Sequence, residues 1–458
     1  MSLEQDTIAA IATPLGNGAI GIVRMSGSQS LSIAQRIFRP HKKHFLSHHI
    51  YYGHIVDKRE EIIDEVLLSI MKAPHSYTTE DMVEINCHGG IIVLKKVLSI
   101  LLENGARMAQ PGEFTKMAFL NGRIDLLQAE AVAEVISAKT ERALIICQNQ
   151  LSGKLSQIVR GLREKLLLLL SYNEVMIDYP EEDYSNISIE SKLKIVDDIY
   201  GVLDKLLQSA SIGINIVSGV TLSIVGKPNV GKSSLLNALL NDERAIVTDI
   251  PGTTRDVISE YITLNGVPFR ILDTAGIRKT EGLIESLGVE RSKNSIEKAD
   301  IVVFVLDVSR ELDEEDKVII DLLKNASCRK VIFANKVDLD KKINKEKLAD
   351  FFPQCPIVEG CLLDNRGLDK LKKEIYGQII SYNVNDSEIA VTNERQKKTL
   401  EKAMGKIPIL RRHIKDNIDP ALISIEIQFI IDALGELIGN VTTEDMLDKM
   451  FSTFCLGK

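Results

Sequence analysis

A glycine-rich stretch near the middle of the chain has the residue types and the spacing of a phosphate-binding loop. It occupies residues 226–233, follows the apolar run 221–225 and precedes the helical pattern 234–240. Gly226 and Gly231 permit backbone conformations that are closed to other residues, so consecutive N–H groups can point at phosphate oxygens beside the positive end of the helix. The order of strand, loop and helix therefore predicts a nucleotide site.

Three side chains of this loop have tasks in such a site. Lys232 is placed to reach the β- and γ-phosphates, and the Ser233 hydroxyl is placed to ligate Mg²⁺. The amide oxygen of Asn229 can ligate a monovalent cation that neutralises transition-state charge, although an asparagine chosen for the turn is the alternative. The residues that we predict to bind the nucleotide here are Asn229, Val230, Gly231, Lys232, Ser233 and Ser234.

A second motif, Asp-Thr-Ala-Gly, ends the apolar strand 269–272. An aspartate in this place can hold Mg²⁺ through water, and the N–H of the glycine can meet the γ-phosphate. Many GTPases carry a glutamine directly after this motif to orient the attacking water, but this chain has Ile277. Another residue must therefore position the water. The predicted nucleotide contacts of the motif are Asp273, Thr274, Ala275 and Gly276, and the candidates for orienting water are Arg278, Lys279, Glu281, Glu285 and Glu290.

A third motif, Asn-Lys-Val-Asp, closes the strand 330–334 and selects the base. The Asp338 carboxylate can accept hydrogen bonds from guanine N1–H and from the 2-amino group, neither of which adenine offers in that place. A buried carboxylate left without donors is penalised heavily, so the contact rejects ATP. We predict that Asn335, Lys336 and Asp338 bind guanine, and we expect the chain to bind and hydrolyse GTP. Upstream, residues 248–256 form a switch segment in which we choose Thr254 as the hydroxyl that joins Mg²⁺.

Size and composition favour an intracellular protein of several domains. The 458 residues suggest two or three domains, and the net charge of −8 disfavours a surface that grips nucleic acid by charge alone. An RNA partner would need a local basic patch or a second protein. Six scattered cysteines have no zinc-ligand spacing, and no secretory signal or bilayer-length apolar stretch is present. We expect a cytoplasmic location with no membrane insertion.

The pattern along the chain predicts three domains. Residues 1–120 mix short β-rich and helical runs, as in a compact α/β domain, and residues 121–217 are helical, with long patterns at 128–138 and 141–173. Residues 218–380 alternate strands and helices, as a parallel sheet requires. Residues 381–458 are helical again, with patterns at 393–412 and 420–439. The two helical parts would lack partners alone, so we expect one discontinuous helical domain into which the nucleotide domain is inserted.

The motifs together resemble the MnmE family, also called TrmE, of bacterial and organellar tRNA-modification GTPases. The resemblance extends from end to end, and the Cys-x-Gly-Lys ending is its most specific part. It implies an N-terminal folate-binding and dimerisation domain, a helical domain and an inserted Ras-like P-loop GTPase domain. The segments that carry the resemblance are 6–8, 12–14, 88–90, 111–114, 118–121, 125–126, 128–131, 248–256 and 454–458.

The resemblance also implies an activity and partners. Family members install a carboxymethylaminomethyl or aminomethyl group at C5 of the wobble uridine (U34) of tRNA, jointly with the FAD-containing partner MnmG. The implied carbon donor is a tetrahydrofolate derivative, in the 5-formyl or 5,10-methylene form. The implied assemblies are a homodimer and a heterotetramer with MnmG, with GTP, Mg²⁺ and K⁺ as further ligands.

Site residues are implied as well. In the family, potassium near the phosphate loop promotes transient dimerisation of the GTPase domains, which switches on hydrolysis, and the resemblance implies the same here. Ser233 and Thr254 match the Mg²⁺ ligands, and Glu285 matches the glutamate that orients water. Thr248, Thr253 and Thr254 join the predicted nucleotide-binding set. The potassium ligands implied by the resemblance are Asn229, Thr248, Ile250 and Thr253.

Four residues match folate-contacting positions: Arg24, Glu84, Arg123 and the terminal Lys458. A guanidinium suits the glutamate-tail carboxylate and a carboxylate suits the pterin donors, which assigns Arg24 and Glu84 to opposite ends as a first guess. Arg123 stands where the family often has lysine, which preserves the charge but changes the donor geometry.

Cys455 is the thiol that the resemblance assigns to the modification chemistry, and a small apolar residue is the alternative. We expect Met450, Phe451 and Phe454 to dock this end of the chain. One departure concerns the Ser-Ala-Lys-like motif that should contact guanine. Residues 359–363 read Glu-Gly-Cys-Leu-Leu instead, so no side chain is assigned there.

Two other classes of GTPase share the nucleotide motifs. A ribosome-assembly GTPase would bind RNA and switch without modification chemistry, but it normally brings a basic RNA-binding module, whereas this chain is acidic and ends in a thiol motif. A mechanical GTPase acting on membranes would need an anchor or a basic amphipathic helix. We expect neither.

Overall fold

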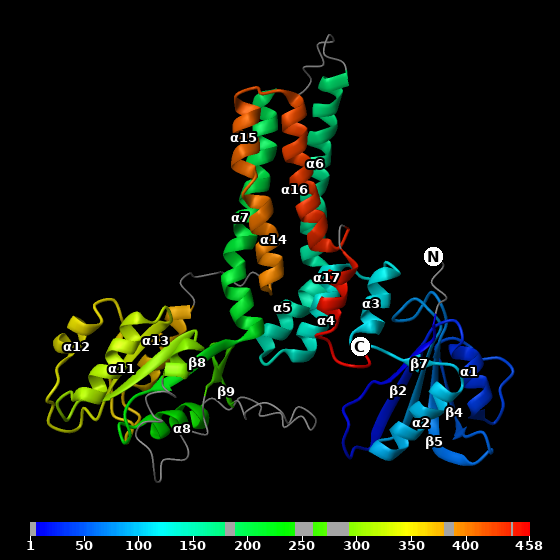
Figure 1. Ribbon diagram of the computed structural model, residues 1–458, viewed down its shortest axis with the longest axis horizontal. Helices are drawn as coiled ribbons and strands as arrows, with labels where there is room; N and C mark the ends of the chain where they lie inside the picture. The colour runs from blue at the N-terminus through cyan, green and yellow to red at the C-terminus, as the bar shows by residue number, and fades with distance from the viewer. Residues whose placement is uncertain (1–5, 179–187, 243–259, 273–292, 380–388, 441–442) are drawn as a thin grey trace.

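The computed structural model describes residues 6–178, 188–242, 260–272, 293–379, 389–440 and 443–458. Three parts are visible in Figure 1: a tall helical bundle stands between two parts that each contain a sheet. Among the residues described, no helix combines the length and the apolar character that crossing a bilayer requires.

The N-terminal part is built on a seven-stranded sheet in the order β3-β4-β5-β6-β2-β1-β7, antiparallel except between β1 and β7. Helices α1 (Ser30–Ile37) and α2 (Ile91–Glu103) pack on one face, where they form a core with alternate residues of β2 such as Val23 and Met25. The opposite face carries Arg24, as the period of two along a strand requires. The strands are β1 (Ile8–Ile11), β2 (Ile20–Ser26), β3 (Phe38–Arg39), β4 (His49–Val56), β5 (Ile62–Met71), β6 (Met82–His88) and β7 (Arg107–Met108).

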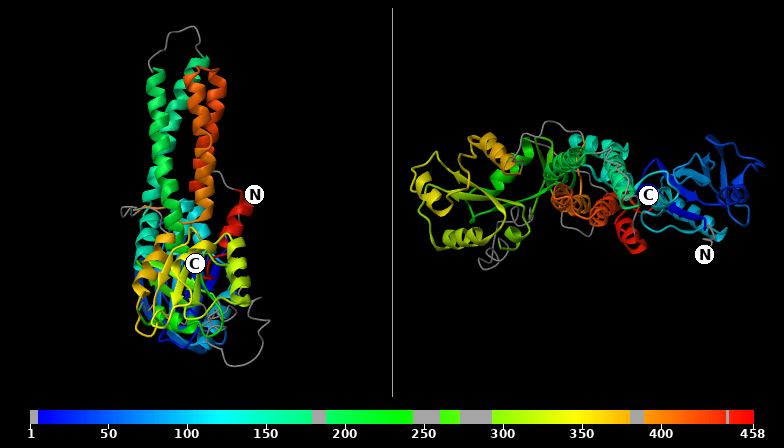
Figure 2. Two further views of the ribbon diagram at one scale, coloured as in Figure 1. Left: turned by 90° about the vertical axis from the view of Figure 1, so that its left-hand side faces the viewer. Right: turned by 90° about the horizontal axis from the view of Figure 1, so that it is seen from above.

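The helical part joins segments from before and after the nucleotide-binding part. One continuous core contains Leu166 of α6, Leu203 of α7 and Ile430 of α16, and the helices stand side by side in both views of Figure 2. The discontinuous helical domain is therefore confirmed. The helices are α3 (Glu113–Leu120), α4 (Leu126–Ser137), α5 (Glu141–Leu151), α6 (Lys154–Asp178), α7 (Ile189–Ser218), α14 (Glu394–Met404), α15 (Ile407–Lys415), α16 (Pro420–Ile438) and α17 (Glu444–Phe451).

Two of the predicted long helices are interrupted. The pattern over 141–173 breaks between α5 and α6, where Gly153 adopts φ +85°, a left-handed conformation that ends a helix. The pattern over 393–412 breaks at Gly405, between α14 and α15. Apolar spacing continued through both breaks, so periodicity alone did not reveal them. The predicted domain limits at 120, 217 and 380 stay a proposal.

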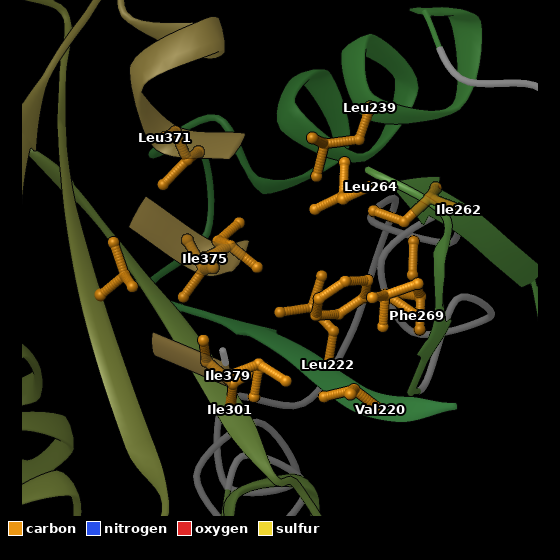
Figure 3. Packing of buried hydrophobic residues seen from close by; sticks show 14 of the residues in the cluster. Val220, Leu222, Leu239, Ile262, Leu264, Phe269, Ile301, Leu371, Ile375 and Ile379 are labelled. Atoms are coloured by element: carbon orange, nitrogen blue, oxygen red, sulfur yellow. The ribbon is translucent and has the colours of Figure 1, made fainter. Parts of the chain in front are cut away.

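The nucleotide-binding part has a six-stranded sheet in the order β13-β12-β11-β8-β10-β9, parallel except for the β9–β10 pair. Figure 3 shows Leu222 and Phe269 from this sheet converging with Ile375 of α13. The strands are β8 (Val220–Val225), β9 (Glu260–Leu264), β10 (Val267–Ile271), β11 (Ile301–Asp307), β12 (Arg329–Asn335) and β13 (Ile357–Glu359); the helices are α8 (Lys232–Asp242), α11 (Glu314–Asn325), α12 (Lys345–Phe351) and α13 (Leu368–Ile379).

A polar network fixes the place where the chain re-enters the bundle before α14. Arg395 pairs with the Glu130 carboxylate through two nitrogens, one of them at 2.9 Å. The Glu134 carboxylate accepts hydrogen bonds from Thr392 at 3.0 Å and Asn393 at 3.1 Å. Burial outweighs these bonds and raises the pKa of Glu134 to about 7.

Replacing Glu134 by glutamine tests whether this carboxyl makes the junction sensitive to pH. Because the folded state raises the pKa of Glu134 to about 7, its stabilisation is complete below the ordinary glutamate pKa and is lost as the pH rises through about 7. We expect the urea midpoint of the wild type to fall more between about pH 5 and pH 8 than that of Glu134→Gln. Glu401→Gln, on the exposed face of α14, is the control. Parallel curves for the wild type and Glu134→Gln would contradict the assignment.

Candidate functional site

The phosphate-binding loop connects β8 to α8 in a conformation that requires its two glycines. Gly226 adopts φ +148°, and a Cβ there would lie 2.4 Å from the carbonyl oxygen of Val305. Gly231 adopts φ +108°, and its Cβ would lie 2.3 Å from the amide nitrogen of Asn335. Any side chain at either position would push the loop away from the strand ends.

Lysines hold the loop at both of its ends. The Lys232 ammonium donates to the Lys227 carbonyl at 2.6 Å, and burial lowers its pKa to about 8. The Lys227 side chain is 7% exposed and forms ion pairs with Asp313 and, at 3.5 Å, with Asp316. Because Asp313 caps the N-terminus of α11, this pairing ties the phosphate loop to the neighbouring helix.

Asn335 links the phosphate loop to the segment that follows β13. Its amide donates to the Val230 carbonyl at 2.8 Å and its oxygen accepts from the Leu362 N–H at 3.3 Å. The next residue, Lys336, donates to Asp307 at 2.6 Å. Burial pushes the pKa of Asp307 upward, but Lys336 and Ser309 outweigh it and hold that pKa below its usual value. Hydrogen bonds thus connect the ends of strands β8, β11 and β12 along one edge of the sheet.

The predicted base-reading carboxylate has a partner from the opposite segment. The Cys361 side chain is buried, with 3% of the residue exposed, and its interaction with the Asp338 carboxylate together with burial raises the pKa of the thiol. This environment favours the protonated thiol next to the predicted base-reading carboxylate.

A second cluster lies on the face of the N-terminal sheet that is opposite α1 and α2. Arg24 and Glu84 are opposite one another on β2 and β6, and their side chains pair at 2.7 and 2.8 Å. The Arg24 guanidinium lies 6.0 Å from the ring of Tyr77 and 5.7 Å from the ring of Phe114. The Arg123 guanidinium lies over the same Tyr77 ring at 4.9 Å.

The C-terminal residues close over this cluster. Arg24 donates to the Gly457 carbonyl at 3.0 Å. Gly457 adopts φ +86°, and a Cβ there would lie 2.5 Å from the carbonyl oxygen of Ile11, so only glycine fits this approach. Phe451 and Phe454 are buried beneath the tail, as expected, while Cys455 stays exposed.

Two family models match the chain: the one described as GTP-binding protein TrmE N-terminus matches residues 7–123, and the one described as MnmE helical domain matches residues 126–455. A protein named tRNA modification GTPase MnmE from Desulforamulus reducens is 46% identical over 460 residues, which cover 99% of each chain. The chain belongs to the MnmE family. A relative of the same name from Clostridioides difficile is 45% identical over 458 residues, again 99% of each chain. The solved G domain of the T. maritima FeoB iron transporter is 24% identical and covers 35% of this chain and 99% of its own, with a TM-score of 0.27.

Several site residues predicted for this MnmE-family chain lie outside the described residues. They belong to the two stretches 243–259 and 273–292, which adjoin β9 and β10 in the sequence. Their predicted roles in binding GTP, Mg²⁺ and K⁺ and in orienting water stay predictions. The residues are Thr248, Ile250, Thr253, Thr254, Asp273, Thr274, Ala275, Gly276 and Glu285.

Sequence reasoning missed two residues that the structure brings into the clusters. Tyr77 lies between Arg24 and Arg123, and no spacing in the sequence marked it. Cys361 stands within the segment that departs from the expected guanine-contacting motif. A search for any side chain able to donate at this position, rather than for serine alone, would have found it.

Replacing Cys361 tests whether its thiol donates a hydrogen bond to Asp338. Cys361→Ala leaves Asp338 without this donor, and a hydrogen bond is worth about 1 kcal/mol, so we expect roughly fivefold weaker GDP binding. Cys361→Ser keeps a donor and should stay near the wild-type affinity. Titration with a fluorescent GDP analogue measures both. Equal losses in the two variants would show that the thiol only packs.

Proposed function

We propose that this protein is the GTP-hydrolysing component of the system that modifies C5 of the wobble uridine (U34) in tRNA, adding a carboxymethylaminomethyl or aminomethyl group. The observation that carries the proposal is the convergence of the Arg24–Glu84 pair with the C-terminal segment that presents Cys455. The same chain holds a guanine-nucleotide site. Membership of the MnmE family supports both halves of the proposal.

A tetrahydrofolate derivative, in the 5-formyl or 5,10-methylene form, is proposed to bind at the N-terminal cluster and to supply the one-carbon unit. The residues suit such a ligand because a carboxylate, two guanidinium groups and two aromatic rings meet there. Three nitrogens of Arg24 already donate to Glu84 and Gly457. Arg123 is therefore the better cation for a glutamate-tail carboxylate, and Arg24 orients Glu84 toward the pterin donors. Lys458, next to Gly457, is proposed to complete the set.

In the nucleotide site, Lys232 and the loop N–H groups would bind the phosphates, and Ser233 with Thr254 would ligate Mg²⁺. Glu285 is proposed to orient the attacking water. Asn229, with φ +62°, adopts a conformation that asparagine tolerates in turns, so its backbone alone accounts for this residue type. Its proposed role as a K⁺ ligand, with Thr248, Ile250 and Thr253, rests on the amide oxygen.

Potassium dependence tests the role of Asn229. We expect GTP hydrolysis to be at least about tenfold faster in potassium chloride than in sodium chloride, since a bound cation neutralises transition-state charge. Asn229→Ser should reduce this ratio toward one, whereas Asn237→Ser, an exposed asparagine of α8, should keep it. Phosphate release at matched ionic strength is the measurement. Equal wild-type rates in the two salts would reject the cation site.

The proposed partners are a second copy of the chain, the FAD-containing protein MnmG in a heterotetramer, and tRNA, in the cytoplasm. Exposed apolar side chains on the face of the N-terminal sheet opposite α1 and α2 support the homodimer, because a large exposed apolar patch is normally covered by a partner. They are Ile20 (66% exposed), Ile50 (67%), Tyr52 (66%) and Leu67 (45%).

Nucleoside mass spectrometry tests the proposed function. Cells lacking the protein should lose the C5-modified wobble uridine, and the wild-type gene should restore it. Asp338→Ala should fail because guanine is no longer read, and Cys455→Ala should fail because the exposed thiol is lost. Unchanged nucleosides in the deletion strain would instead favour a ribosome-assembly GTPase without modification chemistry.

A further inference from the structure

A short segment next to the N-terminal cluster carries two unfavourable local features. It comprises residues 77–80, just before β6, and we call it the Tyr77 segment. Thr79 adopts φ +64°, in the left-handed region that β-branched residues rarely adopt. One carboxylate oxygen of Glu80 is buried and has no hydrogen-bond partner among the described residues. Such features persist only where the surrounding structure enforces them, and they concentrate at functional sites.

A closed ring of hydrogen bonds enforces the conformation of the Tyr77 segment. The Ser26 hydroxyl donates to the Glu80 carboxylate at 2.8 Å and lies 2.6 Å from the Thr78 hydroxyl. Because a hydroxyl carries a single proton, Thr78 must be the donor to Ser26. Thr78 in turn accepts from the Glu80 N–H at 3.3 Å. Ser26 and Thr78 are both fully buried, so opening the ring would leave buried polar atoms without partners.

This ring of hydrogen bonds attaches Tyr77 to the strand that carries Arg24. Ser26 follows Arg24 by two residues on β2, so the two side chains lie on the same face of the sheet. Tyr77 directly precedes Thr78, and its own hydroxyl lies 2.9 Å from the buried Thr115 hydroxyl of α3. The Tyr77 ring is therefore held at both ends, 6.0 Å from the Arg24 guanidinium.

The same segment holds the end of α3 that leads to Arg123. Asn121 is the C-cap of α3, and its amide donates to the Thr78 carbonyl at 2.6 Å. Just beyond the cap, the Arg123 N–H donates to the Ala118 carbonyl at 3.0 Å. The Arg123 guanidinium lies over the Tyr77 ring at 4.9 Å. The Tyr77 segment thus contacts both the backbone that leads to Arg123 and its side chain.

Arg123 carries a charge that the described part of the protein does not neutralise. Arg24 pairs with Glu84, whereas no carboxylate of the described residues lies within ion-pair distance of Arg123. A guanidinium binds a carboxylate best through two parallel N–H groups, and this pairing depends on the direction of the planar group. The contacts that fix Arg123 should therefore affect how tightly an anionic ligand binds.

We propose that Thr78 and Asn121 are positioning residues, which act through Arg123 on the carboxylate end of a bound tetrahydrofolate derivative. The inference rests on the proposed function and adds how the chain orients its ligand-binding cation. Without the Asn121 amide, the end of α3 is no longer tied to the Tyr77 segment, and the guanidinium loses its fixed direction. Without the Thr78 hydroxyl, the ring of hydrogen bonds opens and the segment loses its attachment to β2.

Binding of 5-formyltetrahydrofolate to the full chain, measured by isothermal titration calorimetry, tests the proposal through a double-mutant cycle. We expect Asn121→Ala and Thr78→Val each to weaken binding about tenfold, because a well-directed hydrogen bond to a charged group contributes roughly that much. In an Arg123→Ala background, Asn121→Ala should cause no further loss, since residues that act through one group are not additive. A purely structural role would weaken binding equally in both backgrounds.

Two further variants serve as controls. Thr78→Ser keeps the hydroxyl and should stay near the wild-type affinity. Ser30→Ala removes a buried hydroxyl of α1 that has no hydrogen-bond partner in the part of the chain that the structure describes, and it should bind as the wild type. The urea midpoint without ligand verifies that each variant is folded. Because Asn121 is exposed at a helix end, Asn121→Ala provides the test even if Thr78→Val fails to fold.

Each outcome has a distinct meaning. Wild-type affinity in Asn121→Ala overturns the positioning role and leaves the proposed function intact. A further loss on adding Asn121→Ala to Arg123→Ala also overturns it, because Asn121 would then act independently of the guanidinium. Absence of 5-formyltetrahydrofolate binding by the wild type overturns the proposed folate site, and the inference with it.

Discussion

The close crossing of two backbone segments at Gly213 is the constraint on which the arrangement of the nucleotide-binding part depends. A Cβ at Gly213 of α7 would lie 2.3 Å from the Val391 carbonyl oxygen, so the chain leaving the bundle and the chain returning to it can meet only at a glycine. The Val391 N–H also donates to Ser209 at 3.3 Å. Below the crossing, Ala143 and Ile216 share one core with the nucleotide-binding sheet. The inserted nucleotide-binding part therefore shares a hydrophobic core with the base of the helical bundle.

A second contact ties the two parts at the β9–β10 hairpin. Thr140 donates to the Gly266 carbonyl in the hairpin turn at 2.9 Å, and the Lys139 ammonium lies 5.6 Å from the ring of Tyr261. This hairpin stands, in sequence, between the two predicted switch stretches. The hairpin is thus joined to the corner between α4 and α5, and α4 carries Glu130 and Glu134 of the polar network at the junction.

Local features of the site could be predicted from the sequence because short-range backbone chemistry encodes them. Gly226, Gly231 and Asn335 stand at the fixed positions of their sequence motifs. The geometry of the phosphate-binding loop follows from those residue types. Arg24 and Glu84 were predicted from a family resemblance, but their direct pairing depends on sheet register across 60 positions of chain. Tyr77 and the Glu134 network escaped prediction because only tertiary packing brings their partners together. The helix breaks at Gly153 and Gly405 escaped because apolar spacing runs through them.

The sulfur atom near Asp338 gives the predicted base-reading edge of this chain a chemistry that a hydroxyl would not have. A thiol can be oxidised or can take up a soft metal ion or electrophile, and each product would lose the S–H donor or crowd the carboxylate. The raised pKa of Cys361 and its burial oppose such reactions, because the thiolate is the reactive form. The burial and the raised pKa of Cys361 therefore keep the group next to Asp338 in its thiol form.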